Sequence, residues 1–313
     1  MEMAVTLPRS AARRWLVAMR LPFTTVALAP YLAGAWLARA HGALVSPLAA
    51  ALGLAAVLLI CVGCYLSGEI FDQREDLLTL RHGRSRFAGG TLLVAQGLLP
   101  ARAVAAAAVA CFASALGLGL AVVLVLGAWW LLLLGAFGGL TAALYSTPPV
   151  RLVARGVGEP FIGVCYGWLT LATGYGCASG ALLPHSLWLS LAPAFTVVAI
   201  ILINEFPDFE ADRGAGKRNL LQRVGRPAGA WIYAGLQLGA AAALAGLWAW
   251  ARPGRWGYAA LVVPAVLLSL GLAVQVGLRG RWRAPAALER VCALTVVSNL
   301  VASLEVAVLA RWS

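Results

Sequence analysis

The stretch Asn204-Glu-Phe-Pro-Asp208-Phe-Glu-Ala-Asp212-Arg-Gly-Ala-Gly-Lys217-Arg218 is a polar island in a chain that is otherwise apolar. Asp208 and Asp212 are four residues apart, so on a helix their carboxylates share one face, about 5–6 Å apart at Cβ. Two such charges repel each other unless a cation lies between them. Lys217 and Arg218 follow closely and would complement a phosphate whose other oxygens are held through a metal ion. The stretch is therefore typical of a site that binds a metal ion and a diphosphate.

The same pattern occurs earlier, in Gly68-Glu69-Ile-Phe-Asp72-Gln-Arg-Glu-Asp76. The two motifs are 136 residues apart, the difference between 208 and 72. Adding 136 maps Glu69 onto Glu205, Asp72 onto Asp208, Asp76 onto Asp212 and Arg81 onto Lys217. The two nonapeptides, 68–76 and 204–212, hold eight of the 12 acidic residues of the chain. Acidic groups are thus concentrated at two places, and the chain carries the same arrangement twice.

The composition places the chain in a membrane. Its 313 residues are 62% hydrophobic and only 12% charged, and the mean hydropathy is +0.86, far above that of a soluble globular protein. A net charge of +12 is also found in proteins that bind nucleic acid. Here the basic residues lie between long apolar runs rather than along one solvated face, so we expect them to orient the chain in a lipid bilayer, with no nucleic-acid partner.

The apolar runs predict nine membrane-spanning helices, each with about the 20 residues that cross a bilayer. They are Leu21 to about Ala38, then roughly 44–70, 102–126, 128–147, 159–182, 187–207, 228–250, 257–279 and 288–310. We therefore predict an all-α integral membrane protein, a single domain over residues 1–313, whose helices surround a central cavity. The second and sixth spans run in the same direction and are four helices apart. Two parallel pseudo-repeats, about 15–147 and 159–279, would thus form four-helix halves, with one further helix.

The basic residues predict the orientation of the chain. Alternating the nine spans from a start inside the cell leaves only four of the 24 Lys and Arg residues outside, namely Arg39, Arg252, Arg255 and Arg311. Such an excess of positive charge inside supports both the number of spans and their direction. We expect a bacterial-type inner (plasma) membrane, with the N-terminus and both acidic motifs on the cytoplasmic side. The two motifs would then face each other across one mouth.

The residues at this mouth favour magnesium and an enzyme. Mg²⁺ binds one or two carboxylates together with waters and phosphate oxygens. Zinc would require His or Cys nearby, and the three histidines, His41, His82 and His185, are dispersed. A transporter would place its ionisable residues near the middle of the bilayer rather than at one face. A non-catalytic membrane scaffold has no need of two metal motifs.

Several motifs together resemble one known family. They are Glu69-Ile-Phe-Asp-Gln-Arg-Glu-Asp76, Arg86-Phe-Ala-Gly-Gly90, Leu144-Tyr-Ser-Thr-Pro-Pro-Val-Arg151, Arg155-Gly-Val-Gly-Glu159, and Asn204-Glu-Phe-Pro-Asp-Phe-Glu-Ala-Asp212 with Gly216-Lys-Arg-Asn219. Over about residues 15–300 the chain resembles the UbiA superfamily of intramembrane prenyltransferases, most of all the branch that prenylates 1,4-dihydroxy-2-naphthoate in menaquinone synthesis. The first motif of the family usually begins Asn-Asp, where this chain has Gly68-Glu69.

The resemblance implies that two Mg²⁺ ions, one at Asp72 and Asp76 and one at Asp208 and Asp212, hold the diphosphate of an allylic polyprenyl donor. The donor would ionise, and an electron-rich aromatic acceptor would attack the allylic cation. Tyr145 would line the donor site. The candidate substrate-binding residues are Arg20, Glu69, Arg81, Arg86, Arg151, Asn204, Lys217 and Arg218.

Two alternatives remain open at the level of the sequence. A related enzyme could ionise the same donor but cyclise it or pass it to a non-aromatic acceptor. Arg20, where the first span enters the membrane, either pairs with a carboxylate of the acceptor or extends to the membrane surface.

Overall fold

The computed structural model of the protein describes residues 10–82, 85, 87, 89–251 and 259–310. These residues form helices and connecting segments, without a β-strand among them. The helices are α1 (Ala11–Ala18), α2 (Leu21–Ala40), α3 (Pro47–Phe71), α4 (Gln73–His82), α5 (Ala101–Leu126), α6 (Trp130–Ser146), η1 (Leu152–Ala154), α7 (Gly158–Ile162), η2 (Gly163–Leu169), α8 (Thr170–Ser179), α9 (Ser186–Leu189), α10 (Leu191–Ala215), α11 (Leu220–Trp250), α12 (Ala259–Ala273), η4 (Val274–Leu278), η5 (Arg281–Arg283) and α13 (Pro285–Leu309).

Within the described residues, seven helices are long and apolar enough to cross a bilayer. They are α2, α3, α5, α10, α11, α12 continued by η4, and α13. Helix α6 is apolar but shorter, and α7, η2 and α8 follow one another without a gap. Each predicted span lies on one of these helical segments, and length with hydropathy supports seven of them as membrane-crossing helices. The prediction of an all-helical membrane protein is confirmed.

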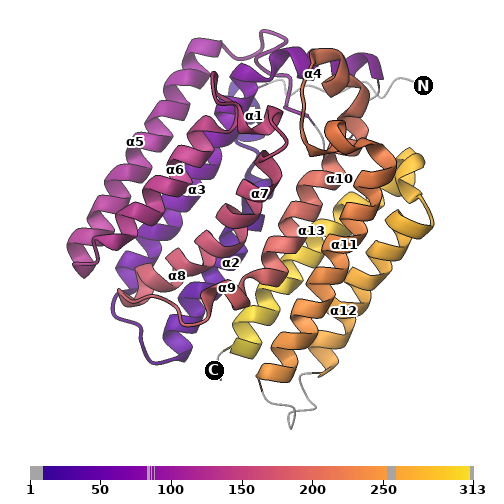
Figure 1. Ribbon diagram of the computed structural model, residues 1–313. Helices are drawn as coiled ribbons and strands as arrows, with labels where there is room; N and C mark the ends of the chain where they lie inside the picture. The colour runs from indigo at the N-terminus through magenta and orange to yellow at the C-terminus, as the bar shows by residue number, and fades with distance from the viewer. Residues whose placement is uncertain (1–9, 83–84, 86, 88, 252–258, 311–313) are drawn as a thin grey trace.

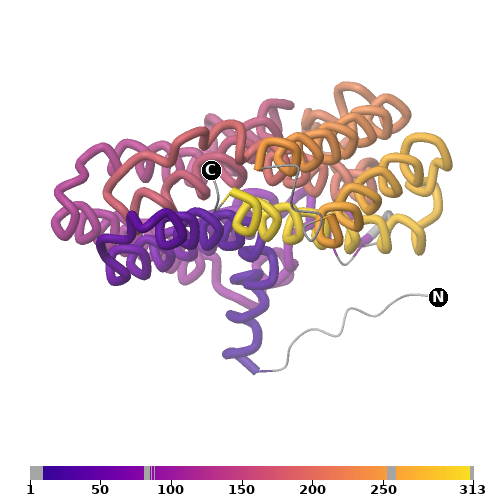
Figure 2. The backbone as a smooth tube through the Cα atoms, turned by 90° about the horizontal axis from the view of Figure 1, so that it is seen from below, coloured from indigo at the N-terminus to yellow at the C-terminus, as the bar shows by residue number. Residues whose placement is uncertain are grey.

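The helices pack side by side in two groups (Figure 1). The first group contains α3 packed on α5 and α6, and the second contains α10 packed on α11 and α13. Helix α2 joins the groups, because it packs on α8 and also contacts α13. Seen along the bundle, the two groups form two lobes, and α1 leads away from them towards the N-terminus (Figure 2).

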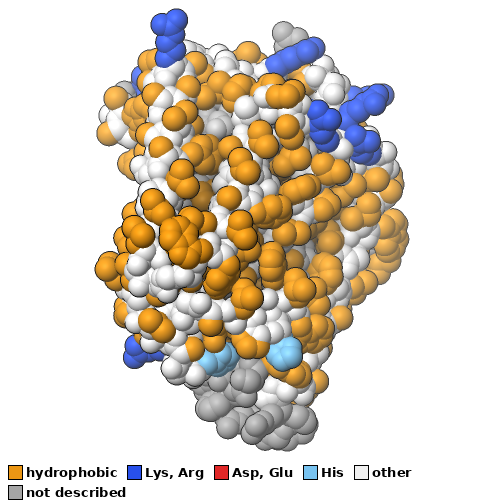
Figure 3. All heavy atoms as spheres, turned by 60° about the vertical axis from the view of Figure 1, so that its left-hand side comes forward, with side chains coloured by type: hydrophobic (Ala, Val, Ile, Leu, Met, Phe, Trp, Pro, Cys, Tyr) orange, Lys and Arg blue, Asp and Glu red, His pale blue; other side chains and the backbone are white. Residues whose placement is uncertain are grey.

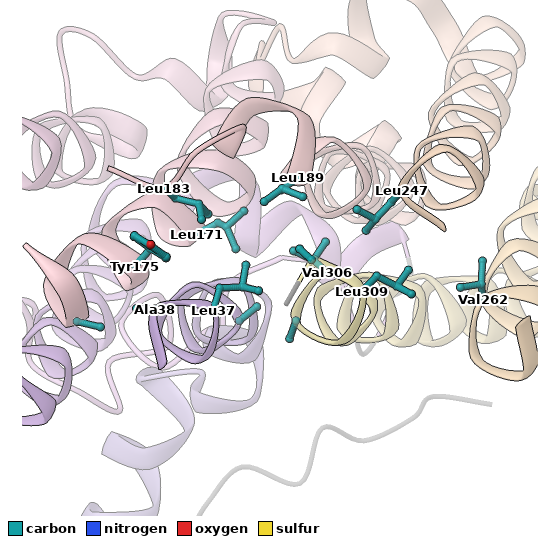
Figure 4. Close-up of a cluster of buried hydrophobic side chains, with 14 residues drawn as sticks. Leu37, Ala38, Leu171, Tyr175, Leu183, Leu189, Leu247, Val262, Val306 and Leu309 are labelled. Atoms are coloured by element: carbon teal, nitrogen blue, oxygen red, sulfur yellow. The ribbon is translucent and has the colours of Figure 1, made fainter. Parts of the chain in front are cut away.

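An apolar cluster closes the end of the bundle remote from the acidic motifs. It contains Leu37 near the end of α2, Leu171 and Tyr175 of α8, and Val306 and Leu309 of α13, all buried (Figure 4). Helix α2 begins at Leu21, beside the acidic end, and therefore reaches this cluster only in its last turns. Burial of so much apolar surface excludes water from this end. The cavity that the acidic motifs line is at the opposite end.

The outer face of α5 and α6 is apolar. Leu116 and Leu124 are each 69% exposed and Leu133 is 73% exposed. Figure 3 shows apolar side chains spread over this side of the molecule, with Lys and Arg mainly near one end. An exposed apolar band of this kind is expected where a protein faces lipid.

Candidate active site

A cavity of about 220 Å³ lies at the acidic end of the bundle, among α2, α3, α4, α6, α7 and α10. All four predicted metal-binding aspartates, Asp72, Asp76, Asp208 and Asp212, line this cavity. The two motifs are 136 residues apart in the sequence but share one space. We refer to it as the acidic cavity.

The second motif presents free oxygen atoms to this cavity. Asp208 and Asp212 lie one turn apart on α10, which extends to Ala215 and so carries the whole motif, beyond the predicted end of the span at 207. Asp212 accepts hydrogen bonds from Lys217 Nζ at 3.3 Å and from Asn219 Nδ2 at 2.8 Å. The Oδ1 atoms of Asp208 and Asn204 are buried without a hydrogen-bond partner. Because a buried acceptor without a partner is unfavourable, these two atoms are suited to bind a cation.

The first motif is already bonded to protein donors. Asp72 ends α3, and Asp76 lies in the first turn of α4. Asp72 accepts from Ser146 Oγ at 2.7 Å and from Arg151 Nη2 at 3.0 Å. The same Arg151 nitrogen lies 2.8 Å from Glu75 Oε1. The Arg151 guanidinium thus neutralises part of the charge of the first motif.

A glycine pair lies between the two motifs. The Gly90 N–H donates to Asp76 Oδ1 at 2.6 Å, and a Cβ atom on Gly89 would lie 3.6 Å from Asp76 Oδ1 and 3.9 Å from Asp208 Oδ2. A Cβ atom on Gly90 would lie 2.0 Å from Asp76 Oδ2, and Gly89 has φ +69°. Both positions therefore require glycine: Gly90 for space and Gly89 for its left-handed backbone.

Burial and mutual repulsion control the charges here. Burial raises the pKa of Asp76 to about 7, and the nearby Glu69 and Asp72 act in the same direction, against the Gly90 N–H. Burial by itself would lower the pKa of Lys217, but the surrounding carboxylates, led by Asp212, raise it above its ordinary value. Lys217 therefore remains a cation within the site.

The residues of the acidic cavity fit magnesium. Among the described residues, seven Asp and Glu side chains but only two basic ones line it. The described residues contain no group of three or more His, Cys, Asp or Glu side chains that could hold a metal ion without other ligands. A cation here would need waters or ligand oxygens as well, which is how Mg²⁺ is usually bound. The unpartnered oxygens of Asn204 and Asp208 supply the hard ligands that it prefers.

Arg20 and Tyr145 also line the acidic cavity. Arg20 precedes α2 with φ 48°, and its guanidinium carbon lies 4.7 Å from the Phe23 ring centroid and 5.6 Å from that of Tyr65. The side chain is therefore held over two aromatic faces at the acidic cavity. Tyr145 is the penultimate residue of α6, directly before Ser146.

The other predicted substrate-binding residues are placed differently. Arg218 is exposed and is not among the residues that line the acidic cavity. Glu69 lines the cavity, but its two carboxylate oxygens accept from the Thr91 N–H at 2.5 Å and the Thr91 Oγ1 at 2.8 Å. Arg81 lies in the last turn of α4. Arg86 lies outside the described residues.

Some residues of the site were not assigned a role from the sequence. Ser146 and the backbone of Gly89 and Gly90 lie within the quoted motifs, and only their contacts reveal what they do. Tyr65 and Tyr166 line the cavity from apolar runs, where no local pattern distinguishes them from packing residues.

A second cavity, of about 70 Å³, adjoins the acidic one. The two share Cys64, Tyr145, Ile162 and Tyr166 as lining residues. The second cavity, called here the apolar branch, is otherwise lined almost entirely by apolar and small residues, including Gly135, Gly138 and Ala142 of α6. The η2 segment on its opposite wall is a π-helix, a wider turn that often marks functional sites.

An all-helical membrane bundle with two repeated acidic motifs at one cavity defines a class of intramembrane protein with an acidic cavity at one end. A model of the UbiA prenyltransferase family matches residues 27–294, and the chain belongs to that family.

Two relatives match parts of the chain. The 1,4-dihydroxy-2-naphthoate octaprenyltransferase of Bacillus subtilis (strain 168) is 27% identical over 170 residues, 54% of each protein. The UbiA prenyltransferase domain-containing protein 1 of Dictyostelium discoideum is 31% identical over 105 residues, 34% of this chain and 32% of that protein. The chain thus spans about half and about a third of the length of these two relatives.

Solved structures share the fold over nearly the whole chain. The apo UbiA homologue from Aeropyrum pernix K1 has a TM-score of 0.68 and 19% identity, and covers 92% of this chain and 98% of its own. The UbiA homologue from Archaeoglobus fulgidus bound to GPP and Mg²⁺ has a TM-score of 0.64 and 16% identity. The match covers 93% of this chain and 99% of that homologue.

Proposed function

We propose that the protein is a magnesium-dependent intramembrane prenyltransferase that moves an allylic isoprenoid chain from its diphosphate to an aromatic acceptor of the quinone-precursor type. One observation carries this proposal: both acidic motifs and Lys217 line a single cavity, and the apolar branch adjoins it. A charged head and an apolar tail of one substrate would match these two regions. Membership of the family supports the same conclusion.

The polar end would bind the diphosphate of the donor. Two Mg²⁺ ions are proposed, one held by Asp72 and Asp76 and the other by Asp208 and Asp212, with Asn204 close to the second. Bound Mg²⁺ would neutralise the diphosphate oxygens as the leaving group departs. Lys217 would supply a fixed positive charge to the same oxygens, and Arg151 would supply another from beside Asp72. The homologue solved with GPP and Mg²⁺ supports a prenyl diphosphate as donor. Arg81, Arg86 and Arg218 remain proposed as outer diphosphate contacts.

The apolar branch would hold the isoprenoid tail. Tyr145 and Tyr166 line both cavities and would therefore flank the donor near the carbon that reacts. When the C–O bond breaks, its electron pair leaves with the diphosphate. Aromatic faces near that carbon would favour the allylic cation that remains, and the apolar walls would exclude water that could capture it.

The acceptor would enter near the same mouth. Arg20 faces the acidic cavity and is proposed to pair with a carboxylate of the acceptor. A ring carbon of the acceptor would bond to the allylic cation and then lose a proton. The name of the Bacillus relative, a dihydroxynaphthoate octaprenyltransferase, supports an aromatic acceptor of this kind.

The proposed membrane arrangement follows the division of basic residues. We propose nine membrane-spanning helices, with α6 and the α7–α8 run as the two that are shorter or interrupted. The acidic cavity and the N-terminus would face the cytoplasm across an inner (plasma) membrane. The two pseudo-repeats of one domain, about 15–147 and 159–279, would then each contribute one acidic motif.

Turnover by the purified protein in lipid nanodiscs tests the proposal. Labelled geranyl diphosphate and octaprenyl diphosphate would be supplied with Mg²⁺, with and without 1,4-dihydroxy-2-naphthoate. We expect a prenylated naphthoate only when the donor, the acceptor and Mg²⁺ are all present. Release of diphosphate with formation of a cyclised hydrocarbon in the absence of an acceptor would instead identify the alternative enzyme, and full turnover in EDTA would refute the role of the metal.

A further inference from the structure

Two glutamates outside the aspartate pairs converge on the start of α11. Glu159 lies on α7 and is 1% exposed, and Glu205 lies on α10, three residues before Asp208. Glu159 Oε1 accepts from the Leu220 N–H at 2.8 Å. Glu205 Oε2 accepts from the Leu221 N–H at 3.2 Å. Side chains from two different helices thus bind consecutive amides of a third.

These hydrogen bonds provide partners for the first N–H groups of α11. The first N–H groups of any helix lack partners within the helix. Here Leu220 and Leu221 donate to the two glutamates, and Gln222 donates to Oδ1 of the N-cap residue Asn219 at 2.9 Å. Carboxylates at this position are also favoured by the helix dipole.

The occupied amides exclude one interpretation of the site. A helix start that follows a Gly-Lys-Arg-Asn sequence is a natural place to bind a phosphate group through backbone N–H groups. The N–H groups of Leu220 and Leu221 already have carboxyl partners, so neither is free to bind a phosphate group. In the proposed function the diphosphate would instead be bound by side chains and metal ions.

The first turn of α11 is linked to the acidic cavity by hydrogen bonds. Asn219 caps α11 with its Oδ1 atom and donates from Nδ2 to Asp212 Oδ2 at 2.8 Å. Asp212 in turn accepts from Lys217. Gly225, with φ 78° and ψ 158°, kinks the helix just afterwards, and the side chain of Leu221 packs the first turn against Ala230 and Tyr233 beyond the kink in one buried cluster. The position of Lys217 thus depends on local contacts.

We propose that Glu159 and Glu205 are positioning residues, which anchor the first turn of α11 so that Asn219 and Lys217 stay directed at Asp212 and at the diphosphate of the donor. Only the final step, in which Lys217 is directed at the diphosphate of the donor, rests on the proposed function. Neither glutamate touches the reacting atoms in this role.

The first acidic motif has a counterpart. Glu69 occupies the position of Glu205 in the earlier repeat, and it binds the backbone N–H and the hydroxyl of Thr91. Thr91 follows Gly90, whose N–H is bonded to Asp76. In each repeat, a glutamate three residues before the first aspartate thus anchors the segment that donates to the second aspartate. Glu69 is accordingly assigned to this anchoring role rather than to substrate binding.

Paired variants of each glutamate test the proposal. Glu159→Gln and Glu205→Gln retain an oxygen that accepts from the amide of Leu220 or Leu221, whereas Glu159→Leu and Glu205→Leu remove it. Glu210→Leu is the matched control. Glu210 lies on the same stretch of α10, but its side chain is 45% exposed, and among the described residues it forms an ion pair with Arg226 alone. All five variants would be prepared in nanodiscs beside the wild-type protein.

The first measurement is hydrogen exchange of the peptide 217–224 without any ligand. We expect exchange at the Leu220 and Leu221 amides to become about tenfold faster in the leucine variants, since a buried N–H that loses its acceptor has about that effect. The glutamine variants and Glu210→Leu should exchange like the wild type. Wild-type exchange in both leucine variants would overturn the proposed anchor, whatever reaction the protein catalyses.

The second measurement is turnover at varied donor concentration. The leucine variants should raise the KM for geranyl diphosphate about tenfold or more, with the glutamine variants restoring the wild-type KM, because a displaced Lys217 would lose a charge-assisted bond to the diphosphate. Faster exchange with an unchanged donor KM would overturn the positioning role. Absence of turnover in the wild-type protein would refute the proposed function. The exchange measurement would still decide whether Glu159 and Glu205 anchor the first turn of α11.

Discussion

At the residue scale, Lys217 and Arg218 are adjacent but differ in their surroundings. Lys217 lies among carboxylates and lines the acidic cavity, whereas the Arg218 side chain is exposed. We predict that Lys217→Met lowers kcat/KM for the donor by about 100-fold, the typical effect of removing one group that stabilises developing charge. Arg218→Met should have a much smaller effect. Steady-state kinetics of the two variants decide this, and equal losses would contradict the placement of Lys217.

Arg20 provides a second residue-scale prediction, which concerns the acceptor. Its guanidinium offers a planar fork that matches a carboxylate, and lysine supplies the charge without that geometry. Arg20→Lys should raise the KM for 1,4-dihydroxy-2-naphthoate about tenfold, corresponding to roughly 1.4 kcal/mol, and leave the KM of the donor nearly unchanged. If the variant prenylates the naphthoate with wild-type kinetics, Arg20 does not bind the acceptor.

Sequence spacing predicted the aspartates of the site but not all of their partners. The separation of four residues placed Asp208 and Asp212 on one helical face, as α10 confirms. Glu69 is a candidate substrate-binding residue from the family resemblance, and its bonds to Thr91 depend on a loop that returns 22 residues later. Contacts of this kind follow from tertiary packing, which spacing within one motif does not contain.

At the scale of elements, α6 and η2 form the walls of the apolar branch. Gly135 of α6 lines the branch, and a Cβ atom there would meet nothing within 4 Å. Gly135→Leu should therefore fold normally and fill the branch. We predict that it lowers kcat/KM for octaprenyl diphosphate by about tenfold or more, a typical effect of misfit in an apolar pocket, with little change for geranyl diphosphate.

Gly139→Leu is the matched control for this prediction. Gly139 lies one turn further along α6, also has open space at Cβ, and is not among the residues lining the apolar branch. The control should use both donors as the wild type does. An equal effect of Gly135→Leu on long and short donors would contradict the assignment of the branch to the isoprenoid tail.

Apolar runs predicted where the helices lie better than how they are interrupted. The runs place a helix on every predicted span, because hydrophobic length determines what can cross a bilayer. The π-helical turn Gly163–Leu169 and the break at Gly225 depend on packing against neighbouring helices. The π-helical turn contributes Cys165, Tyr166 and Leu169 to the apolar branch. Neither feature could be predicted from hydropathy alone.

At the scale of the whole molecule, the division of basic residues predicts a cytoplasmic acidic cavity. Gly214 is exposed near the end of α10, beside that cavity. We predict that Gly214→Cys, introduced into a variant without the native cysteines, reacts with a membrane-impermeant thiol reagent only from the cytoplasmic side in oriented vesicles. Reaction from the opposite side alone would reverse the topology.

The central claim is that both acidic motifs form one site for a metal-bound diphosphate. The most direct test is calorimetric titration of the protein in nanodiscs with the non-reactive donor analogue geranyl thiolodiphosphate, with Mg²⁺ or EDTA, for the wild type, Asp72→Asn and Asp208→Asn. We predict that EDTA, or either substitution alone, weakens binding by about 100-fold, a loss of about 2.7 kcal/mol, while the melting temperature stays near that of the wild type. Wild-type affinity in either variant, or in EDTA, would contradict the shared site.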